Sequence, residues 1–331
     1  MLRQQQISEW LNRLYPGEPF TLSPASADAS FRRYFRAAFA DRTLIVMDAP
    51  PHQEDCKPFL HVAKLFERAG THVPHLFAQD LAHGFLLLSD LGNTTYLQAL
   101  KRENAAKLYG EATDALIAIQ LASRASELPN YDEALLRREL NLFPDWYIAK
   151  HLATSLTTQQ QSKLDEVFSR IVANNLAQPS VYVHRDYHSR NLMWLEDRNP
   201  GILDFQDAVF GPITYDLASL FKDAYIKWEE PEIMDWLIRY WEKARKAGLP
   251  VRPDFGDFYR DYEWMGVQRQ IKVLGIFARL SHRDGKDGYL KDMPLVMDYL
   301  RRACERYIDL KPMLNLLDQL EPRAMQQGYT F

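Results

Sequence analysis

The residues before position 93 alternate between short apolar runs and two helical patterns. Runs rich in aromatic and β-branched residues predict strands at 20–22, 31–39, 43–47 and 85–88. Apolar residues with helical spacing predict helices at 7–14 and 58–69. The last strand runs into Ser89-Asp90-Leu91-Gly92, which we expect to be a hinge between two parts of the chain.

After residue 92 the apolar positions recur mostly with helical spacing. Helices are predicted at 95–127, 132–152, 158–175, 214–228, 231–247, 257–280 and 292–317, and short strands at 180–183, 192–195 and 202–205. Thr158 and Gln161 have the spacing of a capping box. The pattern predicts an α+β fold with two lobes. A small β-rich N-terminal lobe spans residues 1–92, with a hinge at 88–92, and a larger, mainly helical C-terminal lobe spans residues 93–331.

Composition and charge exclude several classes of protein. The chain has 331 residues, of which 47% are hydrophobic and 25% charged, with a net charge of −4, so there is no basic excess to bind a nucleic acid. No apolar stretch approaches the roughly 20 residues that cross a bilayer, and no signal peptide precedes the first helix. Cys56 and Cys304 lie too far apart in sequence for a metal or redox motif. We expect a cytoplasmic enzyme with no nucleic-acid, membrane or obligate protein partner.

Three polar residues have the spacing expected of a catalytic site. Asp186 follows the strand at 180–183, Asn191 comes five residues later (191 − 186), and Asp204 comes eighteen residues later (204 − 186). The turn formers of 196–201 predict a hairpin that brings Asn191 and Asp204 together. Phosphoryl transfer needs a group to accept a hydroxyl proton and oxygen ligands for Mg²⁺ on ATP. We interpret Asp186 as the catalytic base and Asn191 and Asp204 as the metal ligands, with ATP and Mg²⁺ as cofactors.

The sequence offers a comparison for this motif. His282-Arg283-Asp284 repeats the tripeptide His184-Arg185-Asp186, but Tyr289 and Arg302 stand where the two metal ligands would be. The tripeptide alone is therefore weak evidence, and the spacing carries the signal. The alternative interpretation is that Asp186, Asn191 and Asp204 are turn and cap residues.

Several segments resemble a known group of enzymes. The segments 184–191, 202–207 and 211–218 are similar to the catalytic loop, the metal-binding strand end and the following helix start of the aminoglycoside phosphotransferase and choline kinase superfamily. The resemblance implies a protein-kinase-like bilobal fold. The segments 30–36, 46–51, 86–92 and 279–286 are more similar still to its cell-wall recycling sugar kinases. That subgroup implies phosphorylation of the anomeric hydroxyl of N-acetylmuramate and N-acetylglucosamine in peptidoglycan recycling.

Nucleotide-binding candidates come from the predicted strands and the hinge. In protein kinases a lysine on the third strand contacts the phosphates, and here Met47 stands near that place. Arg32 is our candidate to supply the missing charge, with a solvated surface arginine as the alternative. The backbone of the hinge offers groups that match the adenine edge. The candidates are Ser30, Arg32, Met47, Leu88, Ser89, Asp90 and Leu91.

Acceptor-binding candidates lie in the predicted helical lobe. Sugar sites combine a flat apolar surface with hydrogen-bonding groups, and a carboxylate suits a guanidinium fork. The candidates are Asp145, Trp146, His188, Arg190, Gln268, Arg269, Arg279 and Arg283. Asp207 and Asp216 are expected to support the site from behind the residues that bind. Asp216 stands in the first turn after Thr214, where a carboxylate favours the helix dipole.

Two other functions stay open at this point. The same chemistry can act on an aminoglycoside, choline or another small molecule, although cationic acceptors favour a more acidic cleft. A nucleotide-binding regulatory pseudokinase is the alternative of another class, and Met47 in place of lysine is the residue that supports it.

Overall fold

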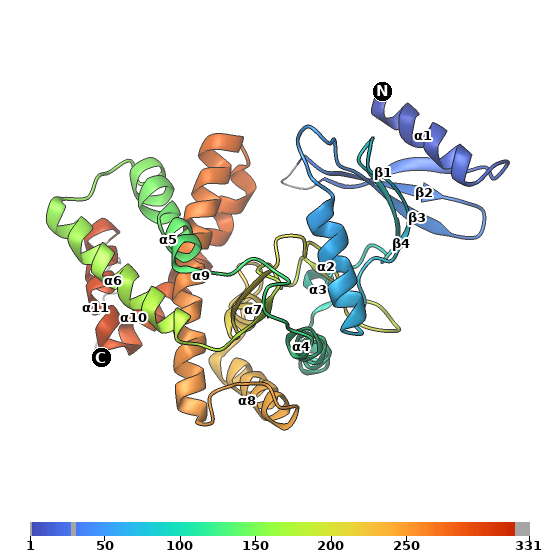
Figure 1. Ribbon diagram of the computed structural model, residues 1–331. Coiled ribbons are helices and arrows are strands. Elements are labelled where there is room, and N and C mark those ends of the chain that lie inside the picture. The colour runs from blue at the N-terminus through green and yellow to red at the C-terminus, as the bar shows by residue number, and fades with distance from the viewer. Residues whose placement is uncertain (1, 28–30, 322–331) are drawn as a thin grey trace, which may run out of the picture. The chain divides into compact units, whose positions relative to one another are not determined.

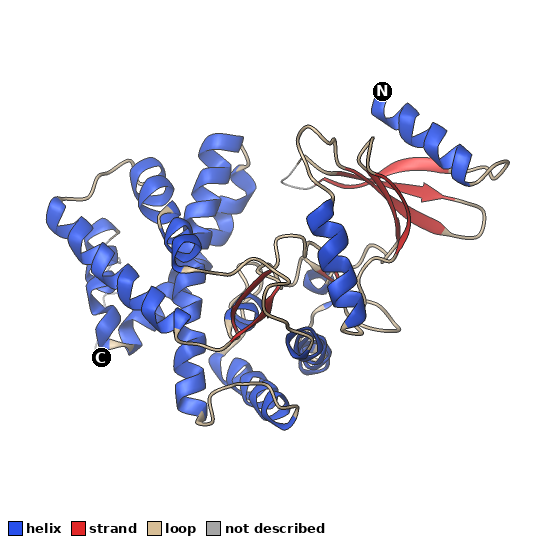
Figure 2. Cartoon of the chain, in the orientation of Figure 1, coloured by secondary structure: helices blue, strands red, loops and turns tan. Residues whose placement is uncertain are grey.

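The chain folds into two compact units. The structure, a computed structural model, describes residues 2–27 and 31–321 (Figure 1). The first unit holds the residues up to Ala122 together with Arg190–Asp207, and the second holds Ser123–Ser189 together with the residues from Ala208 on. The first unit carries a five-stranded sheet and the second is mostly helical (Figure 2), which confirms the predicted α+β class. The two units do not divide at residue 92, because residues 93–122 and 190–207 group with the sheet in the first unit. The lobe boundary stays a prediction.

The sheet of the first unit is antiparallel and has the order β1-β2-β3-β5-β4. Its strands are β1 (Thr21–Ala27), β2 (Arg33–Ala38), β3 (Thr43–Asp48), β4 (Leu76–Asp80) and β5 (Phe85–Ser89). Four of these strands were predicted. The sequence analysis missed β4, which has only five residues and buries none of them fully.

The two faces of the sheet differ because side chains alternate along each strand. Phe35, Val46 and Leu87 point to one face, where they form a core with helix α1 (Leu2–Leu14). Tyr34, Arg36, Ile45 and Leu88 occupy the alternate positions and point to the other face, which lines a cavity. One face of the sheet therefore packs in the core with α1, and the other face lines the cavity.

A buried carboxylate fastens α1 to the sheet. Asp48 is fully buried at the end of β3 and accepts hydrogen bonds from Arg3 of α1 and, at 2.6 Å, from Arg33 of β2. A buried charge needs such partners, because an unpaired carboxylate there would cost several kcal/mol. Arg33 is therefore paired with Asp48 on the face of the sheet that packs against α1.

The rest of the first unit consists of helices and a short hairpin. These elements are α2 (Lys57–Arg68), α3 (Tyr96–Ala99), α4 (Ala105–Leu121), β7 (Leu192–Met193) and β8 (Gly201–Ile202). Phe59 and Phe66 of α2 contact the ring of Phe205 at centroid distances of 4.9 and 5.8 Å. The single helix predicted at 95–127 is wrong. Leu100 has an extended backbone, and the Asn104 side chain binds Ala99 O and Lys101 N across the break between α3 and α4.

The second unit is built around one long helix, α9 (Phe255–Asp284), most of whose residues are buried. Around it lie α5 (Glu133–Leu140), the π-helix η1 (Phe143–His151), α6 (Thr158–Leu176), α7 (Tyr215–Phe221), α8 (Glu230–Lys246), η2 (Asp287–Asp292), α10 (Met293–Arg306), η3 (Ile308–Leu310) and α11 (Lys311–Leu320). Strands β6 (Ser180–Val183) and β9 (Val209–Pro212) pair antiparallel.

Several boundaries in this unit differ from the sequence prediction, and the helix predicted at 214–228 ends at Phe221. The helices predicted at 132–152 and 292–317 are each divided, at residues 141–142 and at Tyr307, which has an extended backbone. The capping box is formed by Thr157 and Gln160 rather than by Thr158 and Gln161, because helix α6 begins with Thr158 itself. Thr157 has the extended backbone that an N-cap requires.

The close approach of η1 to α9 depends on a glycine. A Cβ atom at Gly275 would lie 2.4 Å from the carbonyl carbon of Leu142 and 2.5 Å from its oxygen. Because backbone atoms cannot move aside as a flexible side chain can, we expect Gly275→Ala to lower the free energy of unfolding in urea by about 1–3 kcal/mol.

Gly110→Ala is the matched control for this prediction. Gly110 lies inside α4, and its added Cβ would meet nothing within 4 Å. Alanine should stabilise such a helical position by roughly 0.5–1 kcal/mol. Equal effects of the two substitutions would show that the close contact at Gly275 is not tight.

Candidate functional site

The hairpin β7–β8 brings two predicted site residues together. Leu192 pairs with Ile202 and Met193 with Gly201, and the Leu203 amide donates to Asn191 O at 2.9 Å. Asn191 and Asp204 therefore flank the hairpin on one side, and Asn191 Nδ2 lies 3.3 Å from Asp204 Oδ2. The predicted proximity is confirmed, although each strand has two residues rather than four. The metal-binding role stays a prediction.

The hairpin is anchored within the first unit. The Asn199 side chain donates to Tyr96 Oη at 2.7 Å and to Glu111 Oε2 at 2.5 Å, while its own oxygen accepts from Leu195 N at 3.0 Å. Met193 also forms a bridge with Thr95, and Gly201 one with His72. These contacts explain why the hairpin belongs with the first unit.

The Asp204 carboxylate has a polar and strained setting. Its backbone is left-handed, with a φ of 61°, which is uncommon for a residue other than glycine. Besides the contact with Asn191, its Oδ1 accepts from Gln206 Nε2 at 2.8 Å. Strain of this kind is often kept at functional sites. Among the described residues no cluster of three or more His, Cys, Asp or Glu could hold a metal ion, so an ion at Asp204 would have few protein ligands, as Mg²⁺ often does.

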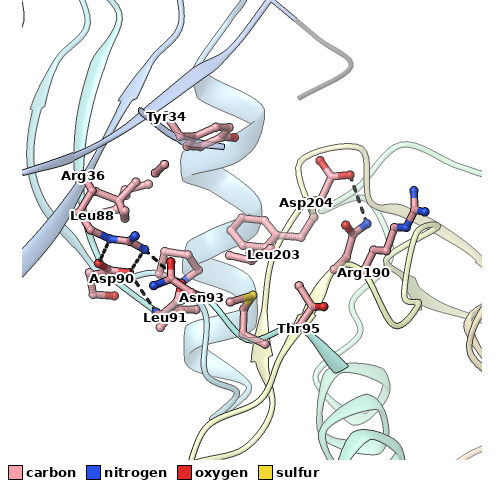
Figure 3. A pocket seen from close by; sticks show the side chains of 18 of the residues that line it. Tyr34, Arg36, Leu88, Asp90, Leu91, Asn93, Thr95, Arg190, Leu203 and Asp204 are labelled. Atoms are coloured by element: carbon pink, nitrogen blue, oxygen red, sulfur yellow. Dashed lines mark hydrogen bonds and ion pairs between the residues drawn. The ribbon is translucent and has the colours of Figure 1, made fainter. Parts of the chain in front are cut away.

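A cavity of about 370 Å³ lies beside the hairpin within the first unit. Figure 3 shows Tyr34, Arg36 and Leu88 from the sheet and Asp204 and Arg190 from the hairpin around it. The hinge residues complete the lining, so four of the nucleotide-binding candidates reach the cavity: Leu88, Ser89, Asp90 and Leu91. Its walls are mostly apolar, with a few polar groups, which is typical of a site for a small molecule or cofactor.

The other three nucleotide-binding candidates lie elsewhere. Met47 is fully buried in β3, and neither it nor Arg32 is among the residues that line the cavity. Arg32 also precedes β2, which begins at Arg33. Ser30 lies outside the described residues. A binding role for these three residues stays a prediction.

Arg36 lines the cavity as well as Arg190, and the charge of Arg36 is already paired. Its Nη2 donates to Asp90 Oδ1 at 3.0 Å and to Gly92 O at 3.2 Å, as Figure 3 shows for the Asp90 pair. Burial alone would raise the pKa of Asp90, but hydrogen bonds from Arg36 and Thr43 lower it. The ion pair therefore holds the hinge, a role that the sequence analysis did not assign to Arg36.

The loop that carries Asp186 in the second unit is held by Asp216. This residue stands in the first turn of α7, as predicted, and is almost fully buried. Its two carboxylate oxygens accept hydrogen bonds from the amides of His184 at 2.7 Å and Arg185 at 3.0 Å. Arg185 has a left-handed backbone with a φ of 77°. Asp216 thus fixes the bend that presents Asp186.

Asp186 lies in a strongly positive setting. Burial alone would raise the pKa of this carboxyl, but the charges of Lys272, His188, Arg269 and Arg185 lower it to about 2. A carboxylate with so low a pKa is ionised at any physiological pH and is a weak base. It is therefore suited to orient a hydroxyl group by accepting a hydrogen bond.

Lys272 was not predicted as a site residue. It is buried in α9, with Nζ 3.1 Å from Glu139 Oε1 and donating to Tyr215 Oη at 2.9 Å. Burial by itself would lower the pKa of Lys272, but Glu139 and Tyr215 raise it, so the ammonium stays charged. Glu139 also pairs with Arg185 of the loop that carries Asp186. This network links α5, α9 and the loop.

The acceptor candidates fall into different environments. His188 and Arg269 are buried in the second unit, and their charges act on Asp186. Gln268 is fully buried and donates to Leu136 O at 3.0 Å, and its substrate-binding role stays a prediction. Arg190 lines the cavity of the first unit.

The remaining candidates lie on η1 and on the second half of α9. Asp145 is exposed and Trp146 half-buried, both on η1. Arg279 is half-buried, and Arg283 forms an ion pair with Asp284 at 2.7 Å. Asp207 is exposed. Substrate-binding roles for Asp145, Trp146, Arg279 and Arg283 stay predictions, as does the supporting role of Asp207.

We expect kcat to fall at acidic pH because Asp216 becomes protonated. Burial raises the pKa of Asp216 to about 7, although the two amide donors oppose the shift. The ionised Asp216 carboxylate accepts hydrogen bonds from both the His184 and the Arg185 amides. If one of its oxygens carried a proton, that oxygen would face an N–H group and one of these hydrogen bonds would be lost. Activity should therefore fall as the pH drops below about 7.

The variant Asp216→Asn tests whether the loss of activity at low pH comes from Asp216 or from another titrating group. The amide cannot accept from both donors at any pH, so the variant should run about tenfold slower at pH 8 and lack the loss of activity at low pH. The measurement is kcat against pH from 5.5 to 8.5. An identical loss at low pH in both proteins would contradict the assignment to Asp216.

Comparisons with known proteins agree with this architecture. Residues 21–253 match the phosphotransferase enzyme family. The chain is 53% identical to an N-acetylmuramate/N-acetylglucosamine kinase of Pseudomonas aeruginosa, over 97% of this chain and 98% of that protein. It is 49% identical to a protein of the same name from Neisseria meningitidis, with both chains fully covered.

Solved structures with low identity share the fold. A choline/ethanolamine kinase family protein from Mesorhizobium loti has a TM-score of 0.65 at 14% identity, covering 96% of this chain and 99% of its own. An aminoglycoside phosphotransferase with bound ADP has a TM-score of 0.60 at 15% identity, covering 89% and 97%. These neighbours confirm the predicted protein-kinase-like fold.

The chain belongs to the phosphotransferase enzyme family. Enzymes of this class use a nucleotide, and a structural neighbour contains ADP. Within the described residues no helix is long and apolar enough to cross a membrane.

Proposed function

We propose that this protein transfers the γ-phosphoryl group of ATP to the anomeric hydroxyl of N-acetylmuramate and N-acetylglucosamine. The observation that carries the proposal is the identity of 53% and 49%, over essentially the whole chain, to two kinases named for these sugars. The geometry of both units is consistent with it. Because the reaction consumes ATP, we place it in the cytoplasm, in the recycling of peptidoglycan sugars.

The cavity of the first unit would hold the nucleotide. Ile45 and Leu88 offer an apolar surface for the adenine ring, and the backbone of Ser89–Leu91 can match its hydrogen-bonding edge. The Arg36–Asp90 pair holds that backbone in place. Arg190 lines the same cavity and is a candidate to contact the phosphates, beside Arg32.

Asn191 and Asp204 would hold Mg²⁺. An amide oxygen and a carboxylate are hard ligands of the kind that this ion prefers. When bound, Mg²⁺ would neutralise charge on the β- and γ-phosphates. Gln206, which donates to Asp204 Oδ1, keeps the carboxylate oriented.

The catalytic loop of the second unit would orient the acceptor. Asp186 accepts a hydrogen bond from the sugar hydroxyl and directs its lone pair at the phosphoryl group. Its pKa of about 2 favours orientation early in the reaction, with proton transfer only as the P–O bond forms. Asp216 and the Lys272 network keep the loop in this position.

A coupled ADP-release assay over a panel of acceptors tests the proposal. The panel contains N-acetylmuramate, N-acetylglucosamine, choline and an aminoglycoside. We expect turnover with the two amino sugars alone, and loss of reducing-sugar reactivity in the product, because a phosphate on the anomeric oxygen blocks ring opening. Turnover with choline or the aminoglycoside instead would assign another acceptor. No turnover with any acceptor, together with nucleotide binding, would favour a regulatory protein.

A further inference from the structure

Three cationic residues of α9 share one face of the helix with Arg283. At 100° per residue, Arg269, Lys272, Arg279 and Arg283 fall within an arc of about 80°. The charges of Arg269 and Lys272 act on Asp186. Arg279 follows Lys272 by seven residues (279 − 272), which is about two turns or 10 Å along the axis. Its side chain is expected to lean toward the N-terminal end of α9, in the direction of Lys272.

The Arg279 guanidinium is half-buried without an anion. Its Nε atom is buried and has no hydrogen-bond partner, and none of the residues that the structure describes forms an ion pair with it. The nearest acid along the helix, Asp284, is already paired with Arg283 at 2.7 and 2.8 Å. Burial lowers the pKa of Arg279, and the charge of Arg283 lowers it further. A desolvated cation of this kind is stabilised by any anion that reaches it.

The π-helix η1 lies along the same stretch of α9. Leu142, just before η1, meets α9 at Gly275, and the ring of His151 meets the ring of His282 at 5.8 Å. Trp146, half-buried in η1, therefore lies along the part of α9 that contains Arg279. An aromatic face beside an arginine suits a sugar that carries an acidic group. π-Helices are often found at functional sites.

We propose that Arg279 binds the carboxylate of N-acetylmuramate and so makes the enzyme distinguish this sugar from N-acetylglucosamine. This inference rests on the proposed function. The two sugars differ by the lactyl ether on C3, which carries the carboxylate. In the pose that we propose, the anomeric hydroxyl lies at Asp186 and the lactyl carboxylate on C3 extends toward Arg279, which follows Lys272 by about 10 Å along α9. N-acetylglucosamine has only a hydroxyl at this position and leaves the guanidinium unpaired.

Steady-state kinetics of Arg279→Gln with both sugars test this assignment. We expect kcat/KM for N-acetylmuramate to fall roughly 10- to 100-fold, the range for a lost charge-assisted hydrogen bond. The value for N-acetylglucosamine should change by no more than about threefold, because a substrate without a carboxylate loses no contact. Arg279→Lys keeps the charge without the planar fork and should give an intermediate loss.

Arg260→Gln serves as the matched control. Arg260 lies on the same helix, is half exposed, and faces Asp309 at 3.6 Å, away from the cationic stretch near Asp186. Its removal should leave the ratio of the two kcat/KM values unchanged.

The outcomes separate this inference from the proposed function. Equal losses for both sugars, or no loss, in Arg279→Gln would overturn the role of Arg279 while the sugar kinase activity stands. If the wild-type protein phosphorylates neither sugar, the proposed function fails first. Should Arg279→Gln not fold, Arg279→Lys decides: a lowered ratio supports the assignment and an unchanged ratio rejects it.

Discussion

Asp186→Asn is expected to lower kcat by about 100- to 10,000-fold, the range for a lost proton-accepting group. The side chain keeps its shape but loses the charge that attracts the acceptor hydroxyl. The neutral amide would also remove one of the negative charges that face Lys272, Arg269 and Arg185. The rate is measured by ADP release with saturating ATP and N-acetylglucosamine.

The loss should fall on turnover and spare nucleotide binding. Asp186 belongs to the second unit, whereas the cavity proposed for the nucleotide lies within the first. We therefore expect the dissociation constant of Mg·ADP, measured by calorimetry, to change by less than about threefold. Near-normal turnover in this variant would remove Asp186 from the reaction.

The repeated tripeptide provides the control for Asp186. Asp284 occupies the same place in His282-Arg283-Asp284 but lies at the end of α9, where it pairs with Arg283. Asp284→Asn should leave turnover of N-acetylglucosamine within about twofold of the wild type. A large loss there would show that the tripeptide at 282–284 has a function that its spacing does not indicate.

The sequence predicted best what depends on local order. The turn formers of 196–201 were sufficient to predict the hairpin and hence the approach of Asn191 to Asp204. Alternation along a strand also accounts for the opposite faces of Arg33 and Arg36, which are three residues apart in β2 and pair with Asp48 and Asp90. Both inferences need only the chemistry of neighbours along the chain.

Contacts between distant segments could not be predicted. Lys272 approaches Asp186 because α9 packs beside the catalytic loop, and the pairing of Arg36 with Asp90 depends on the order of strands in the sheet. A lysine inside a mostly apolar helix gave one usable signal, since a buried ammonium requires a partner. The partner itself, Glu139, lies on another helix. The break between α3 and α4 was missed because the apolar stripe continues across it, while the side chain of Asn104 ends one helix and starts the next.

The strongest test of the metal site uses the strained backbone of Asp204. Its left-handed φ of 61° is tolerated by Asn at least as well as by Asp, but poorly by Ala. Asp204→Asn therefore removes the charge without forcing the hairpin to change. We expect the rate to fall on the order of 100-fold or more, since removing even an indirect supporter of a metal ligand costs 10- to 100-fold.

The Mg²⁺ dependence distinguishes a metal ligand from a structural carboxylate. A ligand that binds only the folded state raises its melting temperature, so Mg·ADP should stabilise the wild-type protein more than ADP alone does. In Asp204→Asn this additional shift should vanish, while the melting temperature without ligand stays close to that of the wild type. Asp197→Ala, at the exposed tip of the same hairpin, should keep both the shift and the rate. If Asp204→Asn retained the full Mg²⁺-dependent shift, the carboxylate would serve only to hold Asn191 and Gln206, and the ion would have to be bound elsewhere.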